Sequence, residues 1–194
     1  MSELPRLVLV RHGQTEWAKT RRHTGRTDIA LTELGQNQAR RLAPLLAASR
    51  FALVLTSPLQ RAADTAALAG FPQAEHDADL LEWDYGAYEG RTTADIRAER
   101  PDWSIFRDGV PEGETLAQIG ARADHFVARV RALEADVLAF TSAHIARVIA
   151  ARWLDQPIGL ARYLVLDPAS LSVLGYDHAK ADPAIRLWNQ TQDA

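Results

Sequence analysis

The sequence predicts an α/β fold, a three-layer sandwich in which a mostly parallel central sheet is flanked by helices. Three observations favour this fold. Segments rich in apolar residues, typical of buried strands, occur at residues 7–10, 51–56 and 136–142. A segment with helical spacing follows each run, and strands that alternate with helices are typical of parallel sheets. A length of 194 residues and a hydrophobic content of 47% suit one domain, residues 1–194, with a substantial core.

The first strand, residues 7–10, leads into a polar stretch over residues 13–30 that is long for a simple connection. Long loops in compact domains are often functional, so this stretch is a candidate for ligand binding. A helix is predicted next over residues 31–47. Thr32 is its predicted cap, because a threonine side chain can accept a hydrogen bond from the first turn.

A second helix is predicted over residues 57–70, directly after the strand at 51–56. Ser57 would cap this helix, and Pro58 suits its first position. Gly70 suits its end. We therefore expect the helix to begin where the second strand ends.

The rest of the chain contains one irregular region. Residues 76–114 are rich in Gly, Pro, acidic and aromatic residues, which predicts an irregular, partly helical insert. Apolar residues recur every three or four positions over residues 116–133, which predicts a long amphipathic helix. The last predicted elements are the strand at 136–142, a helix at 144–154 and closing strands at 164–178 and 184–189.

Composition and charge exclude several classes of protein. A net charge of −3 and a pI near 6.1 leave no basic excess to neutralise a nucleic-acid backbone. The absence of cysteine excludes disulfides, thiolate nucleophiles and cysteine-bound zinc. The N-terminus has no basic region, and its apolar run is too short for a signal peptide or a membrane span. We expect a cytoplasmic protein that binds neither nucleic acid nor membrane.

Polar and basic side chains follow three predicted strands. Arg11 and His12 follow the first strand, residues 57–61 follow the second, and residues 142–147 follow the third. In open α/β sheets the binding crevice lies beyond the carboxyl ends of the strands. We therefore expect these side chains to lie at one edge of the sheet.

This combination of side chains suits phosphoryl transfer. The forked guanidinium groups of Arg11 and Arg61 match phosphate oxygens. Arginines nearby would keep His12 neutral, and a neutral imidazole can attack phosphorus to form a phosphohistidine. Gly13 would let the backbone turn sharply beside it. This chemistry needs no metal ion or other cofactor, and the usual spacings of aspartate or histidine metal ligands do not occur in the sequence.

The leaving group of such a reaction needs a proton donor. Burial among apolar side chains favours a neutral carboxylic acid. Glu82 follows an apolar pair and is close in sequence to Trp83 and Tyr85, so it is the preferred candidate. Asp84 and Glu89 are rivals, although carboxylates in such loops are more often solvated.

Four segments in this order resemble the histidine phosphatase superfamily, the phosphoglycerate-mutase-like proteins: "LVRHGQTEW", "HTGRTDIALTELG", "TSPLQRAADTA" and "LLEWDYGAYEG". The resemblance is greatest to its small acid-phosphatase and sedoheptulose-bisphosphatase types. It implies a phosphoglycerate-mutase-like fold. Ala18 stands where the mutases usually have asparagine, and the chain is shorter than most mutases, which favours a hydrolase.

The resemblance also implies roles for matched residues. It implies that His12 is the phosphorylated nucleophile, that Arg11 and Arg61 bind phosphate, and that Glu82 donates the proton. Further residues at matched positions would line the phosphate or substrate pocket. They are Thr15, Thr24 and Gly25, together with Ser142, Ala143 and His144.

One position departs from the family pattern. The family has a second catalytic histidine in a pattern H-G-x-x-x-R, and here Ser142 and Ala143 stand in place of the histidine and glycine. His144 matches a later position that is often histidine in the acid-phosphatase branch. Loss of a charged donor would cost about 3 kcal/mol, roughly a hundredfold in rate. Either His144 takes the vacant place, or Ser142 is a weaker ligand in a slower enzyme, or the protein binds phosphorylated ligands without turnover.

We therefore expect a metal-independent phosphatase for small phosphomonoesters, such as sugar phosphates or bisphosphates, with its activity reduced by Ser142. A catalytically impaired phospho-ligand-binding protein and a phosphoglycerate mutase are the alternatives. The expected partner is a small phosphorylated metabolite, and a homodimer is an option because related proteins often dimerise.

His23 is expected to be solvated on its basic loop, with a lid over the substrate as the alternative.

Overall fold

A computed structural model describes residues 4–192, so residues 1–3 and 193–194 of the predicted domain lie outside the described residues. The sheet has six strands in the order β3-β2-β4-β1-β5-β6. Strands β1 to β4 pair in parallel, whereas β5 is antiparallel to β1 and β6 is antiparallel to β5. The strands are β1 (Leu7–Arg11), β2 (Leu53–Thr56), β3 (Glu75–His76), β4 (Val137–Thr141), β5 (Leu171–Tyr176) and β6 (Pro183–Gln190). The predicted mostly parallel sheet is confirmed.

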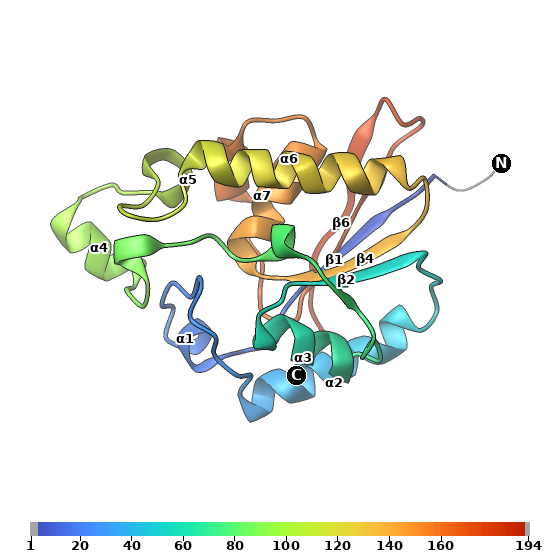
Figure 1. Ribbon diagram of the computed structural model, residues 1–194, viewed down its shortest axis with the longest axis horizontal. Helices are drawn as coiled ribbons and strands as arrows, with labels where there is room; N and C mark the ends of the chain where they lie inside the picture. The colour runs from blue at the N-terminus through green and yellow to red at the C-terminus, as the bar shows by residue number, and fades with distance from the viewer. Residues whose placement is uncertain (1–3, 193–194) are drawn as a thin grey trace.

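Helices cover both faces of this sheet. Helices α6 and α7 lie over one face and α2 and α3 over the other, which makes the three predicted layers (Figure 1). The α-helices are α1 (Glu16–Lys19), α2 (Glu33–Leu46), α3 (Gln60–Leu68), α4 (Thr93–Glu99), α5 (Ile105–Asp108), α6 (Leu116–Ala132) and α7 (Ala143–Trp153). Three 3-10 helices are η1 (Ala78–Leu80), η2 (Gly86–Tyr88) and η3 (Ile158–Tyr163). Among residues 4–192, no helix has the length and hydropathy needed to cross a membrane.

The apolar run in β1 is explained by burial on both faces. Successive side chains of a strand point to opposite faces of the sheet. Leu7 and Leu9 belong to the core cluster that contains the apolar faces of α6 and α7. Val8 and Val10 belong to the cluster that contains α2 and α3. Because both faces are covered, the positions of β1 from residue 7 to residue 10 are all apolar.

Helix α3 begins later than the sequence predicts. Its first residue is Gln60, and Leu59 takes the N-cap position that was predicted for Ser57. The N–H of Ser57 donates to the carbonyl of Phe140 in β4 over 2.9 Å. Ser57 therefore continues the strand and leaves the helix to begin three residues further on.

Strand β5 also begins later, at Leu171 rather than at residue 164. Pro168 has no N–H to donate to a neighbouring strand. Ala169 has a φ of 53°, a left-handed conformation that a strand does not contain. Residues 164–170 instead cross the carboxyl end of β1, where the N–H of Arg11 donates to the carbonyl of Ser170 over 3.0 Å.

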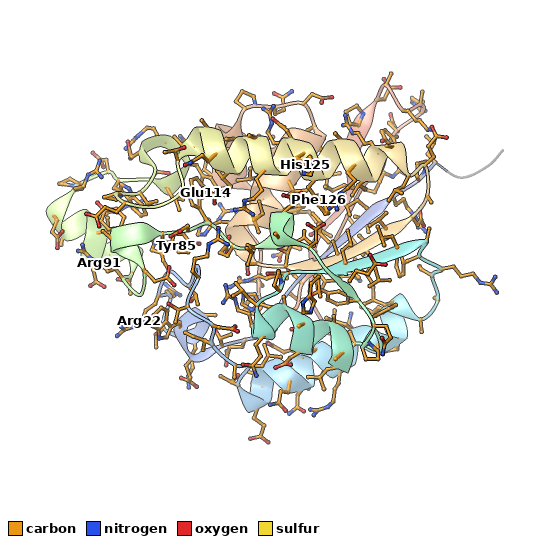
Figure 2. The ribbon with its side chains drawn as sticks, viewed as in Figure 1. Arg22, Tyr85, Arg91, Glu114, His125 and Phe126 are labelled. Carbon is orange, nitrogen blue, oxygen red and sulfur yellow. The ribbon has the colours of Figure 1, made fainter. Side chains whose placement is uncertain are left out.

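The insert between β3 and α6 contains η2, α4 and α5 and is anchored to α6. Arg122 of α6 forms an ion pair with Glu114 over 2.6 Å, and it also donates to the carbonyls of Asp79 and Leu81. In Figure 2, Tyr85 lies between Glu114 at the start of α6 and the loop that carries Arg22. The insert therefore holds the segment that contains Glu82 and Tyr85 against the body of the domain.

Candidate active site

The candidate site lies where the chain leaves β1 and β4. These two strands are parallel neighbours, and the helices that follow them, α2 and α7, lie on opposite faces of the sheet (Figure 1). Such a switch point is where open α/β sheets form a binding crevice. A cavity of about 360 Å³ lies here, and its lining includes Arg11, His12, Glu82, Tyr85, His144 and Arg147.

His12 presents a neutral imidazole to this cavity. Its backbone N–H donates to the carbonyl of Thr141 over 2.9 Å, which fixes it beside β4. Its Nδ1 lies 2.8 Å from the carbonyl oxygen of Gly13, which can only accept, so Nδ1 carries the ring proton and Nε2 keeps its lone pair. Burial, and then the charges of Arg61 and Arg11, hold the pKa of His12 well below its usual value. Nε2 is therefore available as a nucleophile.

Gly13 is required by close packing. A Cβ at this position would clash with the backbone carbonyl of Gly35 in α2, and a Cβ on Gly35 would clash with Gln14. The N–H of Gly13 donates to Oγ1 of Thr65 in α3 over 3.0 Å. The residue after His12 is thus held between two helices, a role additional to the sharp turn that the sequence suggests.

Arg61 is fully buried and supports the loop at residues 13–30. Its two terminal nitrogens donate to three loop carbonyls, those of Thr24 (3.0 Å), Gly25 (2.8 Å) and Thr27 (2.9 Å). Burial lowers the pKa of Arg61, while the carboxylate of Glu82 raises it. The arginine thereby fixes the loop segment that the family motif "TGRTD" occupies.

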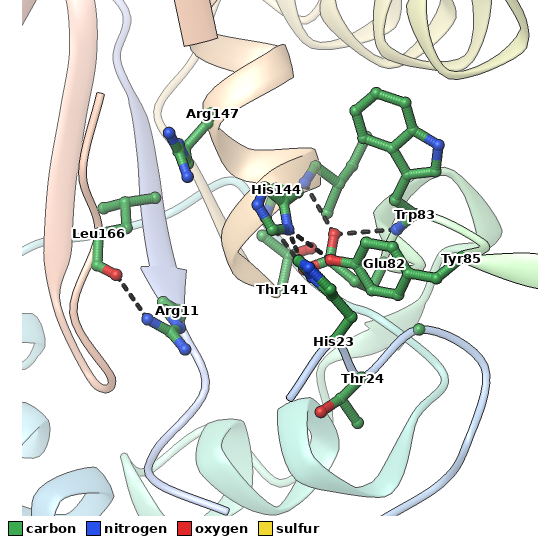
Figure 3. Close-up of polar contacts among 12 residues, drawn as sticks. Arg11, His23, Thr24, Glu82, Trp83, Tyr85, Thr141, His144, Arg147 and Leu166 are labelled. Atoms are coloured by element: carbon green, nitrogen blue, oxygen red, sulfur yellow. Dashed lines mark hydrogen bonds and ion pairs between the residues drawn. The ribbon is translucent and has the colours of Figure 1, made fainter. Parts of the chain in front are cut away.

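Arg11 is held in a similar way on the other side of His12. Its Nη1 donates to the carbonyl of Leu166, in the segment that crosses the end of β1 (Figure 3). Burial lowers its pKa, and Glu82 again is the charge that most raises it. In the described part of the chain, the buried Nε atoms of Arg11 and Arg61 have no hydrogen-bond partner.

The hydroxyl of Ser142 is a third buried donor without a partner among residues 4–192. Ser142 is 1% exposed and occupies the N-cap of α7, but its side chain makes no capping hydrogen bond. It directly follows Thr141, the residue that binds the backbone of His12. Unpartnered buried donors are costly, and a tetrahedral oxyanion beside His12 could accept from all three.

Glu82 is 3% exposed and caps the first turn of α7. Its Oε1 accepts the N–H groups of Trp83 and Ile145, each over 2.9 Å. Its Oε2 accepts the N–H of His144 over 3.0 Å (Figure 3). The carboxylate of Glu82 thus occupies two of the N–H groups at the start of α7. Because Oε2 accepts only one hydrogen bond, it is the oxygen with a lone pair left to hold a proton.

The buried Tyr85 and the partly buried His144 form a pair that the sequence does not predict. The Tyr85 hydroxyl is hydrogen bonded to Nδ1 of His144 (Figure 3). Burial raises the pKa of Tyr85 well above its usual value. Burial, followed by the charge of Arg147, holds the pKa of His144 well below its usual value. Both side chains are therefore neutral near pH 7.

His23 is 9% exposed, so the prediction that it is solvated is wrong. Its ring centroid lies 4.8 Å from Tyr85, 5.7 Å from Trp103 and 5.8 Å from His144. Its Nε2 is 3.3 Å from Oγ1 of Thr93. Burial lowers its pKa to about 4. The sequence could not show that the insert folds over the loop at 13–30 and covers this histidine.

Arg147 is among the side chains expected after the third predicted strand, but sequence reasoning assigned it no role at the site. It lines both this cavity and a neighbouring one of about 700 Å³. It donates to the carbonyls of Ala161 and Arg162, and its guanidinium lies 4.6 Å from the ring centroid of Phe106. Burial lowers its pKa to about 10, so it stays charged near neutral pH. Its place three residues after His144 on a helix was a usable signal, because such side chains share a face.

Of the other site residues predicted from the sequence, some line the cavity and the others hold the surrounding loop in place. Thr24 and Ala143 line the cavity. Thr15 is fully buried, and its Oγ1 accepts the N–H of Ala18 over 3.1 Å as the cap of α1. Gly25 supports the loop, since its N–H donates to Glu89 over 2.8 Å.

The two rival carboxylates have structural partners. Glu89 accepts the N–H groups of Gly25 and Thr27. Asp84 forms an ion pair with Arg26 over 3.8 Å. Across residues 4–192, no group of three or more His, Asp or Glu side chains is arranged to hold a metal ion. The donor set of the cavity, rich in guanidinium groups, suits an oxyanion such as phosphate.

Comparisons with known proteins agree with this chemistry. The family model of the histidine phosphatase superfamily (branch 1) matches residues 7–191. An acid phosphatase from Mycobacterium tuberculosis is 40% identical over 186 residues, which cover 93% of this chain and 91% of that protein. A sedoheptulose 1,7-bisphosphatase from Saccharomyces cerevisiae is 36% identical over 183 residues, which cover 77% of this chain and 67% of that protein. A solved structure of an open-reading-frame product from Mycobacterium tuberculosis matches with a TM-score of 0.91 at 37% identity, covering 96% of this chain and 98% of that one.

Proposed function

The chain belongs to the histidine phosphatase superfamily and is a phosphatase, and we propose that it hydrolyses small phosphomonoesters through a phosphohistidine on His12, without a metal ion. One observation carries the proposal. Three buried donors have no partner among residues 4–192: Nε of Arg11, Nε of Arg61 and Oγ of Ser142. The charges of both arginines act on the neutral imidazole of His12, and Ser142 directly follows the residue that binds the His12 backbone. A bound phosphoryl group has three non-bridging oxygens that these donors could satisfy.

In the first step, Nε2 of His12 attacks phosphorus as the bond from phosphorus to the ester oxygen breaks. The ring gains positive charge, which the carbonyl of Gly13 stabilises through its hydrogen bond with Nδ1. Oε2 of Glu82 donates a proton to the departing oxygen. Arg11 and Arg61 stabilise the charge on the equatorial oxygens.

In the second step, water attacks the phosphohistidine. Glu82, now a carboxylate, takes a proton from this water as the P–N bond breaks. Inorganic phosphate leaves, and both His12 and Glu82 return to their starting protonation states. Ser142 supplies a hydrogen bond but no charge, so turnover is slowed unless a second donor acts on the phosphoryl group beside it.

Sugar phosphates or bisphosphates are the proposed substrates. Arg21, Arg22 and Arg147 line the cavity that Arg11 and His12 also line, which favours a substrate with a second anionic group. The relative from Saccharomyces cerevisiae is a bisphosphatase, in agreement with this class. A cytoplasmic location, a small phosphorylated metabolite as the partner and the absence of nucleic-acid binding belong to the same proposal, with a homodimer as an option.

Rapid quench with a phosphate-labelled phosphomonoester tests the mechanism. We expect label on His12 within the first turnover, and we expect His12→Asn to lose both the label and at least about a thousandfold in kcat. His178→Asn, at a side chain that is 87% exposed, is the matched control and should label normally. Unlabelled protein with normal turnover would refute the phosphohistidine. Phosphate binding without any turnover would support the alternative of a binding protein, and transfer of label to 3-phosphoglycerate would support a mutase.

A further inference from the structure

Tyr85 and His144 form a hydrogen-bonded pair at the wall of the cavity. Tyr85 is 2% exposed, and in residues 4–192 its hydroxyl has a single partner, Nδ1 of His144. His144 packs between other rings, with its centroid 5.3 Å from Phe106 and 5.8 Å from His23. The imidazole is therefore held in one orientation by packing and by the Tyr85 hydroxyl.

The hydrogen bond determines which ring nitrogen carries the proton. A buried phenol that keeps its proton needs an acceptor, and within the described residues the Tyr85 hydroxyl contacts one, Nδ1 of His144. A lone pair on Nδ1 places the single proton of a neutral imidazole on Nε2. If Nδ1 carried a proton instead, the phenolic proton would be left buried without an acceptor.

The charged groups around His144 oppose a second proton on its ring. Arg147 lies on the same helix and Arg11 comes from β1, and both disfavour an imidazolium. His23, from the loop at 13–30, acts in the same direction. Oε2 of Glu82 lies 4.0 Å from Nδ1 of His144, beyond hydrogen-bond distance, so it does not hold a proton on Nδ1.

Nε2 of His144 lies on the opposite side of the ring from the Tyr85 hydroxyl. It has no hydrogen-bond partner in residues 4–192, and it is not one of the buried unpartnered atoms, so it faces open space. His144 lines the same cavity as His12. An N–H at this position can donate to an oxygen of the group that His12 attacks.

From these contacts we propose that Tyr85 is a positioning residue that fixes the Nε2–H tautomer of His144, so that a neutral donor faces the phosphoryl group beside Ser142. This inference rests on the proposed function. It means that His144 needs no swing into a vacant place, since its backbone on α7 and the Tyr85 hydroxyl already direct it. Two weak donors, Ser142 Oγ and His144 Nε2, then act at the place where the family has one histidine.

Steady-state kinetics of Tyr85→Phe, His144→Ala and the double variant test this proposal. We expect Tyr85→Phe to lower kcat for a phosphomonoester about tenfold or more while KM changes less than about threefold, because the donor acts mainly in the transition state. In the His144→Ala background, Tyr85→Phe should cause no further loss. Wild-type activity in Tyr85→Phe, or an equal fractional loss with and without His144, would overturn the proposal.

Nitrogen-15 NMR of the histidine rings gives a readout that does not depend on turnover. We expect His144 to show the Nε2–H tautomer at pH 7 in the wild type, and a mixture of tautomers in Tyr85→Phe. The Nδ1–H tautomer or an imidazolium in the wild type would overturn the proposal even if no variant is stable enough for kinetics. The spectrum of His12→Asn should retain the His144 signal, so a failure of the phosphohistidine mechanism can be distinguished from a failure of this inference.

Discussion

The backbone N–H of His144 donates to Oε2 of Glu82 over 3.0 Å, which joins the first turn of α7 to the insert. The same carboxylate accepts the N–H groups of Trp83 and Ile145. Glu82 therefore holds the insert against α7 and, in the proposed mechanism, also moves the proton. These two roles can be separated by substitution.

We expect Glu82→Gln to lose both stability and activity. The single carbonyl oxygen of the glutamine can accept from the N–H groups of Trp83 and Ile145, but its NH₂ group then faces the N–H of His144. A buried N–H left without an acceptor lowers the free energy of unfolding by about 1–3 kcal/mol. The loss of the proton donor should lower kcat roughly a hundredfold or more. Denaturant unfolding and steady-state kinetics measure the two effects.

Glu89→Gln is the matched control for this substitution. Glu89 also accepts backbone N–H groups, those of Gly25 and Thr27, but it has no part in the proposed chemistry. We expect a loss of stability with kcat within about threefold of wild type. An equal fall in kcat in both variants would show that Glu82 acts only by holding the structure.

Ser142→Ala separates phosphate binding from folding. The Oγ has no partner among the described residues, so its removal should leave the unfolding free energy unchanged or slightly raised. Affinity for phosphate or vanadate should fall about fivefold, which corresponds to about 1 kcal/mol for one hydrogen bond. Isothermal titration calorimetry measures this affinity, and unchanged binding would remove Ser142 from the set of phosphate ligands.

Ser142→His restores the histidine of the family pattern. If His144 already donates to phosphate through its Nε2, this variant should change kcat less than about threefold in the wild-type background. In the His144→Ala background it should raise kcat roughly tenfold or more, because a cationic donor then replaces a lost one. A large gain in the wild-type background would mean that His144 does not fill the position.

Gly13→Ala should destabilise the protein through a steric clash with Gly35 in α2. Overpacking of this kind costs about 1–3 kcal/mol, and displacement of the neighbouring His12 should lower activity as well. Gly159→Ala is the matched control, because a Cβ there meets nothing within 4 Å. Thermal unfolding should show a lower Tm for Gly13→Ala only, and equal Tm values would contradict the close approach of loop and helix.

The free energy of unfolding should decrease as the pH is lowered from about 6.5. His12, His23 and His144 all have a pKa lowered by burial, so the unfolded state binds more protons than the folded state. The stabilisation is present above the unfolded pKa and is lost as the pH falls from about 6.5 toward the folded values. For His23, with a pKa of about 4, this loss amounts to about 2 kcal/mol at pH 5.

His23→Phe tests this contribution directly. The ring can still pack against Tyr85 and Trp103, but it no longer titrates. The free energy of unfolding should therefore fall less steeply from pH 7 to pH 5 than in the wild type. Denaturant unfolding at several pH values gives the two slopes, and identical slopes would show that His23 does not titrate on unfolding.

Much of the fold could be predicted from local patterns. The run at residues 7–10 and the 3–4 spacing over 116–133 were sufficient, because burial on both faces of a strand or on one face of a helix leaves a direct record in the sequence. The start of α3 could not be predicted locally. Ser57 resembles a helix cap, but its N–H pairs with Phe140, more than eighty residues away in the chain.

The sequence by itself determined the types of chemical group at the site: a histidine nucleophile candidate, two arginines, a carboxylate, and a serine where the family has a histidine. Only the tertiary structure decided the state of these groups. The proton of His12 is placed by the Gly13 carbonyl and by the charges of Arg61 and Arg11, and Glu82 is bound by the first turn of α7. Protonation and hydrogen bonding depend on burial and on neighbours from distant segments, and those neighbours are brought together only when the sheet, the insert and the loop at 13–30 fold over one another.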